Sequence, residues 1–129
     1  MIAIDANAVV ALLVDDAELG RSSRRAYEQH DLTAPDLLSY EVTSVLRKLC
    51  QLNAITERVA EHALRDLNLL RVDTVPYGDI AQRMWELRDN LSVYDAAYVA
   101  VAELFEVELL TFDQRVRRAP GPRCEFVSV

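Results

Sequence analysis

Short apolar segments alternate along this chain with longer segments in which hydrophobic residues recur at helical spacing. The apolar segments at residues 2–4, 32–34, 71–75, 107–112 and 125–129 each have the length and composition of one buried strand. Successive strands that are separated by helices pair in parallel, since each helix carries the chain back across the sheet. The alternation therefore predicts an α/β fold with a mostly parallel central sheet and helices on both faces.

Particular residues indicate where several helices begin. Asn7 is the expected N-cap of the first helix, and Ser92 is the expected N-cap of a helix at residues 93–105. Pro76 is expected at the first position of a helix that reaches about residue 88. The remaining helices are expected at residues 18–30, 36–52, 56–70 and 113–118.

The chain has 129 residues, the size of one ordinary domain, and we assign residues 1–129 to a single unit. No apolar run reaches the roughly 18 residues of a membrane-spanning helix. The N-terminal residues lack the basic region of a signal peptide, and Asp5 interrupts their apolar stretch. We therefore expect a cytoplasmic protein that does not associate with a membrane.

The net charge of −7 argues at first sight against a nucleic-acid partner. The charge is unevenly distributed, however, because residues 111–129 contain Arg115, Arg117, Arg118 and Arg123 against only two acids. Carboxylates gathered around a metal ion would also lose part of their negative field to that ion. A nucleic-acid partner therefore remains possible.

Asp5 and Asp113 each directly follow a predicted strand, at residues 2–4 and 107–112. In open α/β sheets, ligands bind beyond the carboxyl ends of the strands, so acids at these positions are well placed for chemistry. The alternative is that each is only the N-cap of the helix that follows, a common role for aspartate.

Asp95 lies in a helix that is otherwise apolar on all sides, and such a helix is expected to be buried. A buried carboxylate is costly unless it is hydrogen-bonded, paired or bound to a metal ion. The competing interpretation is a capping box, because Ser92 and Asp95 have the spacing of that motif. The two roles are compatible, since a helix N-terminus in a crevice can direct a carboxylate toward a metal.

Glu41 lies at the edge of the apolar stripe of its helix, roughly 80° from the centre of that stripe. From this position its side chain can extend from the core boundary into a cleft. The alternative is a solvated helix glutamate that pairs with Arg47 or Lys48.

These acids and their neighbours resemble the four acidic positions of the PIN domain, and particularly those of VapC-type toxins. The matching pieces are residues 4–7, 40–42, 94–100 and 110–113, in the same order and at similar spacing. The resemblance covers essentially the whole chain. One departure is Ala6, which stands where the family usually has Ser or Thr.

The resemblance implies a metal-dependent endoribonuclease that uses Mg²⁺ or Mn²⁺, for which oxygen ligands are suited. On this interpretation Asp5 and Asp95 bind the metal directly. Glu41 and Asp113 complete the site as ligands of a second ion, as holders of a water molecule or as a general base.

Polar residues around the acids receive supporting roles from the same resemblance. Asn7 and Thr111 match polar positions of the family and are expected to orient ligands or water. Arg115, Arg117 and Arg118 follow Asp113 and could hold the RNA backbone, although a solvated basic helix face is an equal alternative.

The resemblance further implies a homodimer that binds a small cognate antitoxin through an amphipathic segment laid across a hydrophobic groove. The expected walls of that groove are the helices at residues 18–30 and 37–70.

Other functional classes remain open from the sequence. A metal-dependent phosphatase of the haloacid-dehalogenase type needs a second Asp two residues after the first, and position 7 is Asn. Both that class and a receiver-like signalling domain need a lysine late in the chain, whereas the last lysine is Lys48. A PIN-like domain that binds without catalysis is a further alternative.

Overall fold

A computed structural model describes all 129 residues of the chain. Its centre is one sheet of four parallel strands in the order β3-β2-β1-β4. The strands are β1 (Ile2–Ile4), β2 (Leu32–Pro35), β3 (Val72–Val75) and β4 (Leu109–Leu110). The predicted parallel α/β architecture is therefore confirmed.

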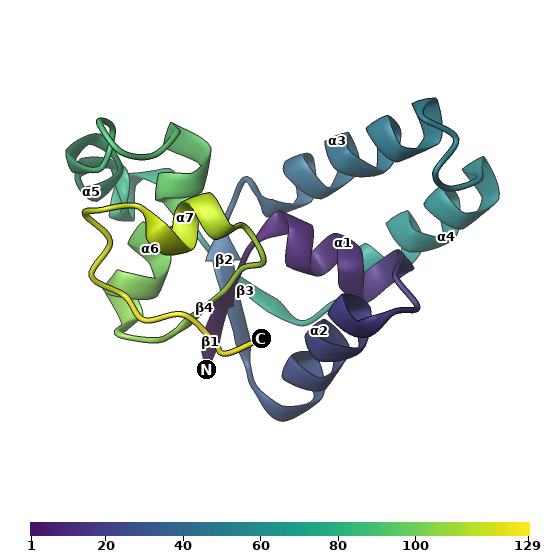
Figure 1. Cartoon of the computed structure of the whole chain (residues 1–129), viewed down its shortest axis with the longest axis horizontal. Helices are drawn as coiled ribbons and strands as arrows, with labels where there is room; N and C mark the ends of the chain where they lie inside the picture. The colour runs from purple at the N-terminus through teal and green to yellow at the C-terminus, as the bar shows by residue number, and fades with distance from the viewer.

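Helices cover both faces of this sheet (Figure 1). One side carries α1 (Ala6–Val14), α2 (Glu18–Gln29), α3 (Leu38–Gln51) and α4 (Glu57–Leu67). The other side carries α5 (Ala81–Glu86), α6 (Val93–Phe105) and α7 (Gln114–Arg118). The short 3₁₀ helix η1 (Tyr77–Asp79) precedes α5. None of the helices is long and apolar enough to span a bilayer.

The centre of helix α6 is buried, as its apolar sequence predicts, whereas Val93, Tyr94, Leu104 and Phe105 at its ends are exposed. Its residues from Ala96 to Ala102 are all buried, and the helix packs against β1, β2 and β4. On the opposite side, α3 buries Leu38, Val42 and Leu46, which belong to its predicted apolar stripe. The core is therefore continuous from one helical layer through the sheet to the other.

The N-terminus of α1 differs from the sequence-based prediction. The N-cap is Asp5, whose carboxylate accepts a hydrogen bond from the Ala8 amide at 2.8 Å, and Asn7 lies exposed in the first turn. Aspartate and asparagine are equally good N-caps, so the point at which β1 ends decides between them. Asp5 is the first residue after the strand and takes the position.

Three predicted segments are shorter or more broken in the structure than in the prediction. The helix expected at 76–88 is divided into η1 and α5, with Gly78, a poor helix former, inside η1. The strand expected at 107–112 is reduced to the two residues of β4. The strand expected at 125–129 is reduced to one bridge between Leu109 and Phe126. With only two residues in β4, little edge remains for a fifth strand to pair with.

Gly20 permits the close approach of α2 to the end of α1. A Cβ at this position would clash with the carbonyl oxygen of Asp15 and would lie 2.8 Å from that of Ala11. We expect Gly20→Ala to lower the free energy of unfolding by about 1–3 kcal/mol, the usual cost of overpacking. Gly78→Ala is the matched control, because a Cβ there meets nothing within 4 Å. Urea unfolding that gives equal stabilities for the two variants would contradict this account of α1–α2 packing.

Candidate active site

The parallel pairing of β1 with β4 brings two of the predicted acids to one edge of the sheet. Asp5 follows β1 directly, and its backbone amide still donates to the carbonyl of Leu110 at 3.2 Å. Asp113 lies three residues beyond the end of β4, because the chain leaves the sheet at Thr111. Electrostatic repulsion from Asp113 contributes to raising the pKa of Asp5, which places the two carboxylates within interaction range.

Burial dominates the electrostatics of Asp5. Loss of solvent raises the pKa of the Asp5 carboxyl from 3.8 to about 6, with further increases from the charges of Asp95 and Asp113. Hydrogen bonds from the Thr111 hydroxyl and the Ala8 amide oppose this effect by stabilising the carboxylate. Asp5 is therefore a carboxylate held at an energetic cost, an arrangement that a cation would relieve.

Asp95 lies half-buried in the first turn of α6, close enough to Asp5 and Glu41 to raise the pKa of each. Its backbone amide donates to the Ser92 hydroxyl at 3.1 Å, so the predicted N-cap is confirmed. The reciprocal bond from the Ser92 amide to the Asp95 carboxylate does not form, so the capping box is incomplete. The Asp95 carboxylate remains available for a ligand.

Glu41 lies in the first turn of α3 and is joined to α6 across the site. The Tyr98 hydroxyl donates a hydrogen bond of 2.7 Å to Glu41 Oε1. Burial raises the pKa of Glu41, against the lowering effect of this hydrogen bond, and repulsion from Asp95 raises it further. The alternative of a solvated glutamate paired with Arg47 or Lys48 is wrong, because Glu41 forms no salt bridge with either.

Tyr98 is a site residue to which sequence reasoning assigned no role. It belongs to a motif rich in alanine and tyrosine, where an aromatic side chain is expected to serve the core, and it is indeed buried. Burial and the neighbouring carboxylates raise its pKa far above the ordinary tyrosine value, so the hydroxyl stays a proton donor. Its spacing of three residues from Asp95 on α6, one helical turn, was the signal that could have identified it.

Asp113 is the N-cap of α7 and is bound by Arg115. Its carboxylate accepts from the Arg115 amide at 2.9 Å and from the guanidinium at 3.0 and 3.3 Å. These interactions hold the pKa of Asp113 below its usual range. The cap interpretation of Asp113 is therefore correct, and its charge also reaches Asp5.

Thr111 supports both acids of the sheet edge. The residue is fully buried, and its hydroxyl oxygen accepts from the Asp113 amide at 3.1 Å while the same side chain hydrogen-bonds Asp5. Asn7, the other predicted supporting residue, is exposed in the first turn of α1, and its side chain forms no hydrogen bond. Of the two, only Thr111 contacts a candidate catalytic residue.

The three arginines of α7 have different environments. Arg117 donates to the carbonyls of Thr111 and Val127 at 3.1 and 3.0 Å and stacks on Phe126, which ties the C-terminal segment to β4. Arg115 is 89% exposed while it pairs with Asp113, and Arg118 is exposed. Arg115 and Arg118 therefore face solvent, with Arg115 paired to Asp113, whereas Arg117 holds the fold.

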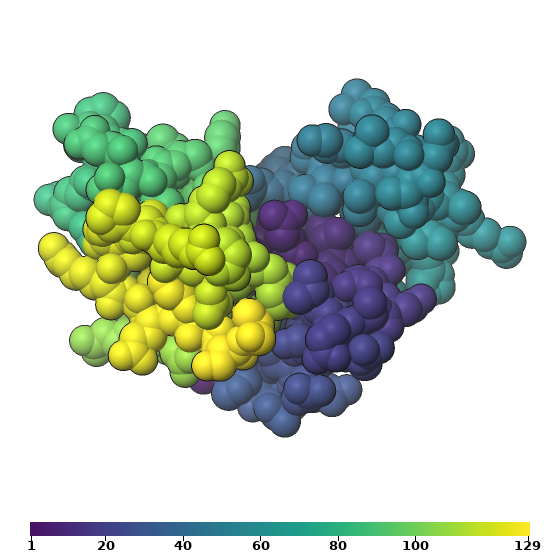
Figure 2. All heavy atoms as spheres, in the orientation of Figure 1, coloured from purple at the N-terminus to yellow at the C-terminus, as the bar shows by residue number.

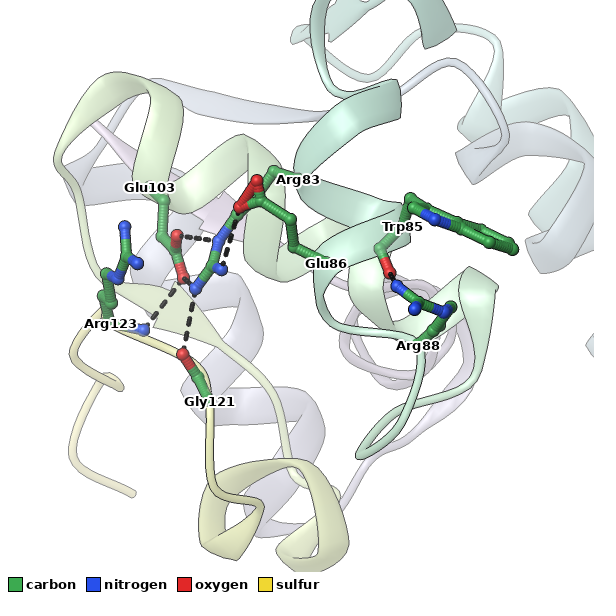
Figure 3. Close-up of polar contacts among 7 residues, drawn as sticks. All are labelled: Arg83, Trp85, Glu86, Arg88, Glu103, Gly121 and Arg123. Carbon is green, nitrogen blue, oxygen red and sulfur yellow. Dashed lines mark hydrogen bonds and ion pairs between the residues drawn. The ribbon is translucent and has the colours of Figure 1, made fainter.

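A network of polar contacts fixes α6 from its far end (Figure 3). Arg83 of α5 donates to both oxygens of Glu103 of α6, at 2.6 and 3.2 Å, and to the Gly121 carbonyl at 2.9 Å. The Arg123 amide donates to Glu103 as well, at 2.8 Å. Glu103 therefore joins α5 and the C-terminal loop to the helix whose first turn carries Asp95.

The space-filling view shows a notch in the molecule, between the part formed by α5, α6 and α7 and the part formed by α1 and α3 (Figure 2). The N-terminus of α1 and the first turns of α3, α6 and α7 are directed toward this region (Figure 1). A chain-like substrate could therefore lie along the notch and reach the acids that these helix ends carry.

The donors at this site suit a hard divalent cation. All four candidate side chains offer carboxylate oxygens, and two of them, Asp5 and Asp95, lie in mutual electrostatic contact. No three carboxylate, imidazole or thiol side chains converge into a complete cage. Mg²⁺ requires no such cage, since it is usually held by one or two carboxylates and keeps several waters. The chemistry of these oxygen donors therefore suits Mg²⁺.

Comparison with known proteins agrees with this geometry. The PIN domain family matches residues 2–122. Ribonuclease VapC9 of Mycobacterium tuberculosis is 34% identical over 129 residues, which cover 100% of this chain and 98% of that protein. The chain therefore belongs to the PIN-domain family and, within it, to the VapC ribonucleases.

Solved structures share the fold. VapC20 of Mycobacterium tuberculosis, a Sarcin-Ricin loop cleaving toxin, superposes with a TM-score of 0.68 at 18% identity and covers 90% of this chain and 92% of its own. A chain of a toxin–antitoxin complex from Klebsiella pneumoniae has a TM-score of 0.62 at 24% identity, with 99% and 97% covered.

The raised pKa of Asp5 has a consequence for stability in the absence of metal. The Asp5 carboxyl has a pKa of about 6 in the folded protein and 3.8 in the unfolded chain, so the folded state binds the proton more tightly. This difference favours the folded state at low pH, and the contribution is lost as pH rises from 3.8 to about 6. In chelator, the free energy of unfolding of wild type minus that of Asp5→Asn should fall between pH 4 and 7, by at most about 3 kcal/mol. Asparagine preserves the N-cap, so the difference isolates the charge. A difference that does not change with pH would contradict the burial of this carboxylate.

Proposed function

We propose that this VapC ribonuclease is the toxin of a toxin–antitoxin pair and hydrolyses RNA phosphodiester bonds in the cytoplasm with Mg²⁺, for which Mn²⁺ can substitute. The observation that carries the proposal is the pair formed by Asp5 and Asp95. One carboxylate is buried at an energetic cost, and the other lacks a partner of its own. Neither carboxylate has a basic side chain as a partner, so a bound cation is the charge that would stabilise both.

Asp5 and Asp95 are the residues that would hold the metal ion. When bound, the ion supplies charge stabilisation at the reacting phosphate and lowers the pKa of a water molecule. The Thr111 hydroxyl and the Ala8 amide keep Asp5 oriented, because both bond to its carboxylate. The first turn of α6 orients Asp95 through its bond to Ser92.

Glu41 is the proposed general base. Burial raises its pKa above the ordinary glutamate value, which makes the carboxylate a better proton acceptor for a water molecule. The Tyr98 hydroxyl holds one carboxylate oxygen, so the other is left to accept the proton. Asp113, whose pKa is low, stays ionised and contributes negative charge beside Asp5.

The RNA backbone is proposed to pass Arg115 and Arg118, the two arginines of α7 that face solvent. Asp113 already neutralises part of the charge of Arg115, so an approaching phosphate would have to share that guanidinium. Phosphate contacts of this kind carry affinity and little sequence information.

The antitoxin is proposed to cover a surface formed by α1, α2 and α4. Leu13 at the end of α1 lines three neighbouring hollows of about 540, 430 and 350 Å³ in this region. Their walls include the apolar side chains of Leu12, Val14, Ile55, Val59, Leu69 and Leu70. Grooves of this type take the apolar face of an amphipathic segment. A structurally similar chain belongs to a toxin–antitoxin complex, which supports an antitoxin partner for this chain. We also propose a homodimer, on the family resemblance alone.

Activity should depend on the divalent ion and on both proposed ligands. Asp5→Asn and Asp95→Asn keep side-chain size and remove the charge that the ion needs. We expect each to lower the rate of RNA cleavage in Mg²⁺ roughly 100-fold or more, at least the cost of losing a supporting residue of a metal site. The control is Asp31→Asn. Asp31 is exposed, and its backbone carbonyl accepts a hydrogen bond from the Ile2 amide at the amino ends of the strands, away from the acids.

The measurement is release of fragments from single-stranded RNA, with Mg²⁺ or with chelator, beside phosphate release from a small phosphoester. Folded Asp5 and Asp95 variants that cleave RNA at the wild-type rate would remove the site assignment. Phosphate release without RNA cleavage would instead favour a phosphatase.

Replacing Arg115 and Arg118 together with Ala should weaken RNA binding more at low salt than at high salt. Two lost phosphate contacts to a single strand should reduce the slope of log affinity against log salt concentration by up to about 1.4. Arg21→Ala with Arg25→Ala is the control pair, because these arginines lie on α2. An unchanged slope in the α7 variant would place the RNA on another surface.

A further inference from the structure

A small apolar hollow lies at the carboxyl ends of β2 and β3, on the same edge of the sheet as the acids. Its volume is about 110 Å³. Its lining comprises the last residues of β2 and β3, the start of α3, and residues of η1, α5 and α6. These residues are Pro35, Asp36, Leu37, Val75, Tyr77, Ile80, Met84 and Ala97.

The hollow is adjacent to the proposed catalytic residues. Strand β2 is the direct neighbour of β1, whose end carries Asp5, and neighbouring strands lie about 5 Å apart. Leu37 accepts the backbone hydrogen bond of Glu41 at 3.0 Å, so the wall of the hollow is one helical turn from that acid. On the other side, Ala97 places α6, the helix whose first turn carries Asp95, in the wall of the hollow.

We propose that this hollow binds one unpaired RNA base next to the scissile phosphate, an inference that rests on the ribonuclease function proposed above. The walls are apolar, as the face of a base requires, and Tyr77 lines the hollow while 69% of its surface is exposed. Exposed aromatic rings stack on bases in single-stranded RNA recognition. Since Asp5 follows the strand next to β2, a base in the hollow would belong to a nucleotide near the cleaved bond.

The walls of the hollow are already formed without RNA. The Asp36 amide donates to the Val75 carbonyl at 2.9 Å, and Pro35 pairs with Val75 in the sheet register. Ile80 and Met84 are buried against the core. A preformed pocket loses little conformational freedom when a ligand enters, which favours its use for recognition.

Asp36 supplies a specificity element, because it is the one charged residue in the lining. Its side chain is exposed at the start of α3 and forms no salt bridge. A carboxylate accepts hydrogen bonds from an exocyclic amino group, such as N4 of cytosine, whereas uracil offers only its single ring N3–H as a donor. The pocket should therefore prefer a base that carries an amino group.

The decisive experiment is a double-mutant cycle between Tyr77 and the base. Wild-type cleavage of a mixed-sequence single-stranded RNA in Mg²⁺ first locates a preferred bond. An oligoribonucleotide around that bond is then made with an abasic nucleotide at each flanking position in turn. In wild type, one abasic position should raise KM about tenfold, within the range for loss of one stacked base. In Tyr77→Ala the intact oligonucleotide should already have the raised KM, and the abasic change should cost little more.

Matched variants separate stacking from general damage. Tyr77→Phe keeps the ring and should retain wild-type KM, whereas Tyr40→Ala removes a ring that is 82% exposed but lies outside the hollow and should leave the abasic cost intact. Leu37→Trp adds bulk to another lining residue of the hollow and should reproduce the Tyr77→Ala result. All four should show the wild-type circular dichroism spectrum.

Base preference provides the second readout. With cytosine or uracil at the sensitive position, wild type should favour cytosine in kcat/KM by several-fold, and Asp36→Asn should reduce or reverse that ratio. If the abasic nucleotide raises KM equally in wild type and in Tyr77→Ala, the proposal is overturned. This result is expected if the hollow binds an apolar side chain of the antitoxin instead of a base. No cleavage of any RNA by wild type would instead overturn the proposed function itself.

Discussion

The site depends on the convergence of four helix N-termini at one edge of a parallel sheet. Each candidate acid is the N-cap or a first-turn residue of its own helix, and the four are Asp5 of α1, Glu41 of α3, Asp95 of α6 and Asp113 of α7. Unpaired backbone amides and the positive end of the helix dipole stabilise negative charge at these positions. This compensation lowers the cost of bringing mutually repelling carboxylates toward one another.

The four carboxylates are not stabilised equally, and this difference distinguishes their roles. Asp113 has a guanidinium partner and a low pKa, whereas Asp5 has only neutral donors and a raised pKa. Capping and catalysis are therefore not exclusive explanations for Asp5, because the same carboxylate orients α1 and faces the site. A cation bound by Asp5 and Asp95 would offset the burial cost of Asp5 and its repulsion from Asp95, which the protein's own donors leave uncompensated.

The surroundings divide the remaining surface by function. The carboxyl edge of the sheet holds the acids and, beside them, the apolar hollow lined by Tyr77. The hollows around Leu13 lie among α1, α2 and α4, away from the Arg83–Glu103 network that fixes α6. On the functions proposed above, the substrate is recognised at the carboxyl ends of the strands and the partner protein on α1, α2 and α4.

The sequence by itself determined the alternation of strands and helices, the buried character of α6 and the order of the four acids, because these depend on local hydrophobic periodicity and residue type. Only the tertiary structure decided that Asp5 rather than Asn7 caps α1, that Arg117 holds the C-terminal segment, and that the last strand is a single bridge. The bond between Tyr98 and Glu41 joins residues 57 positions apart. Such contacts arise from the packing of whole elements against each other, and no local pattern encodes them.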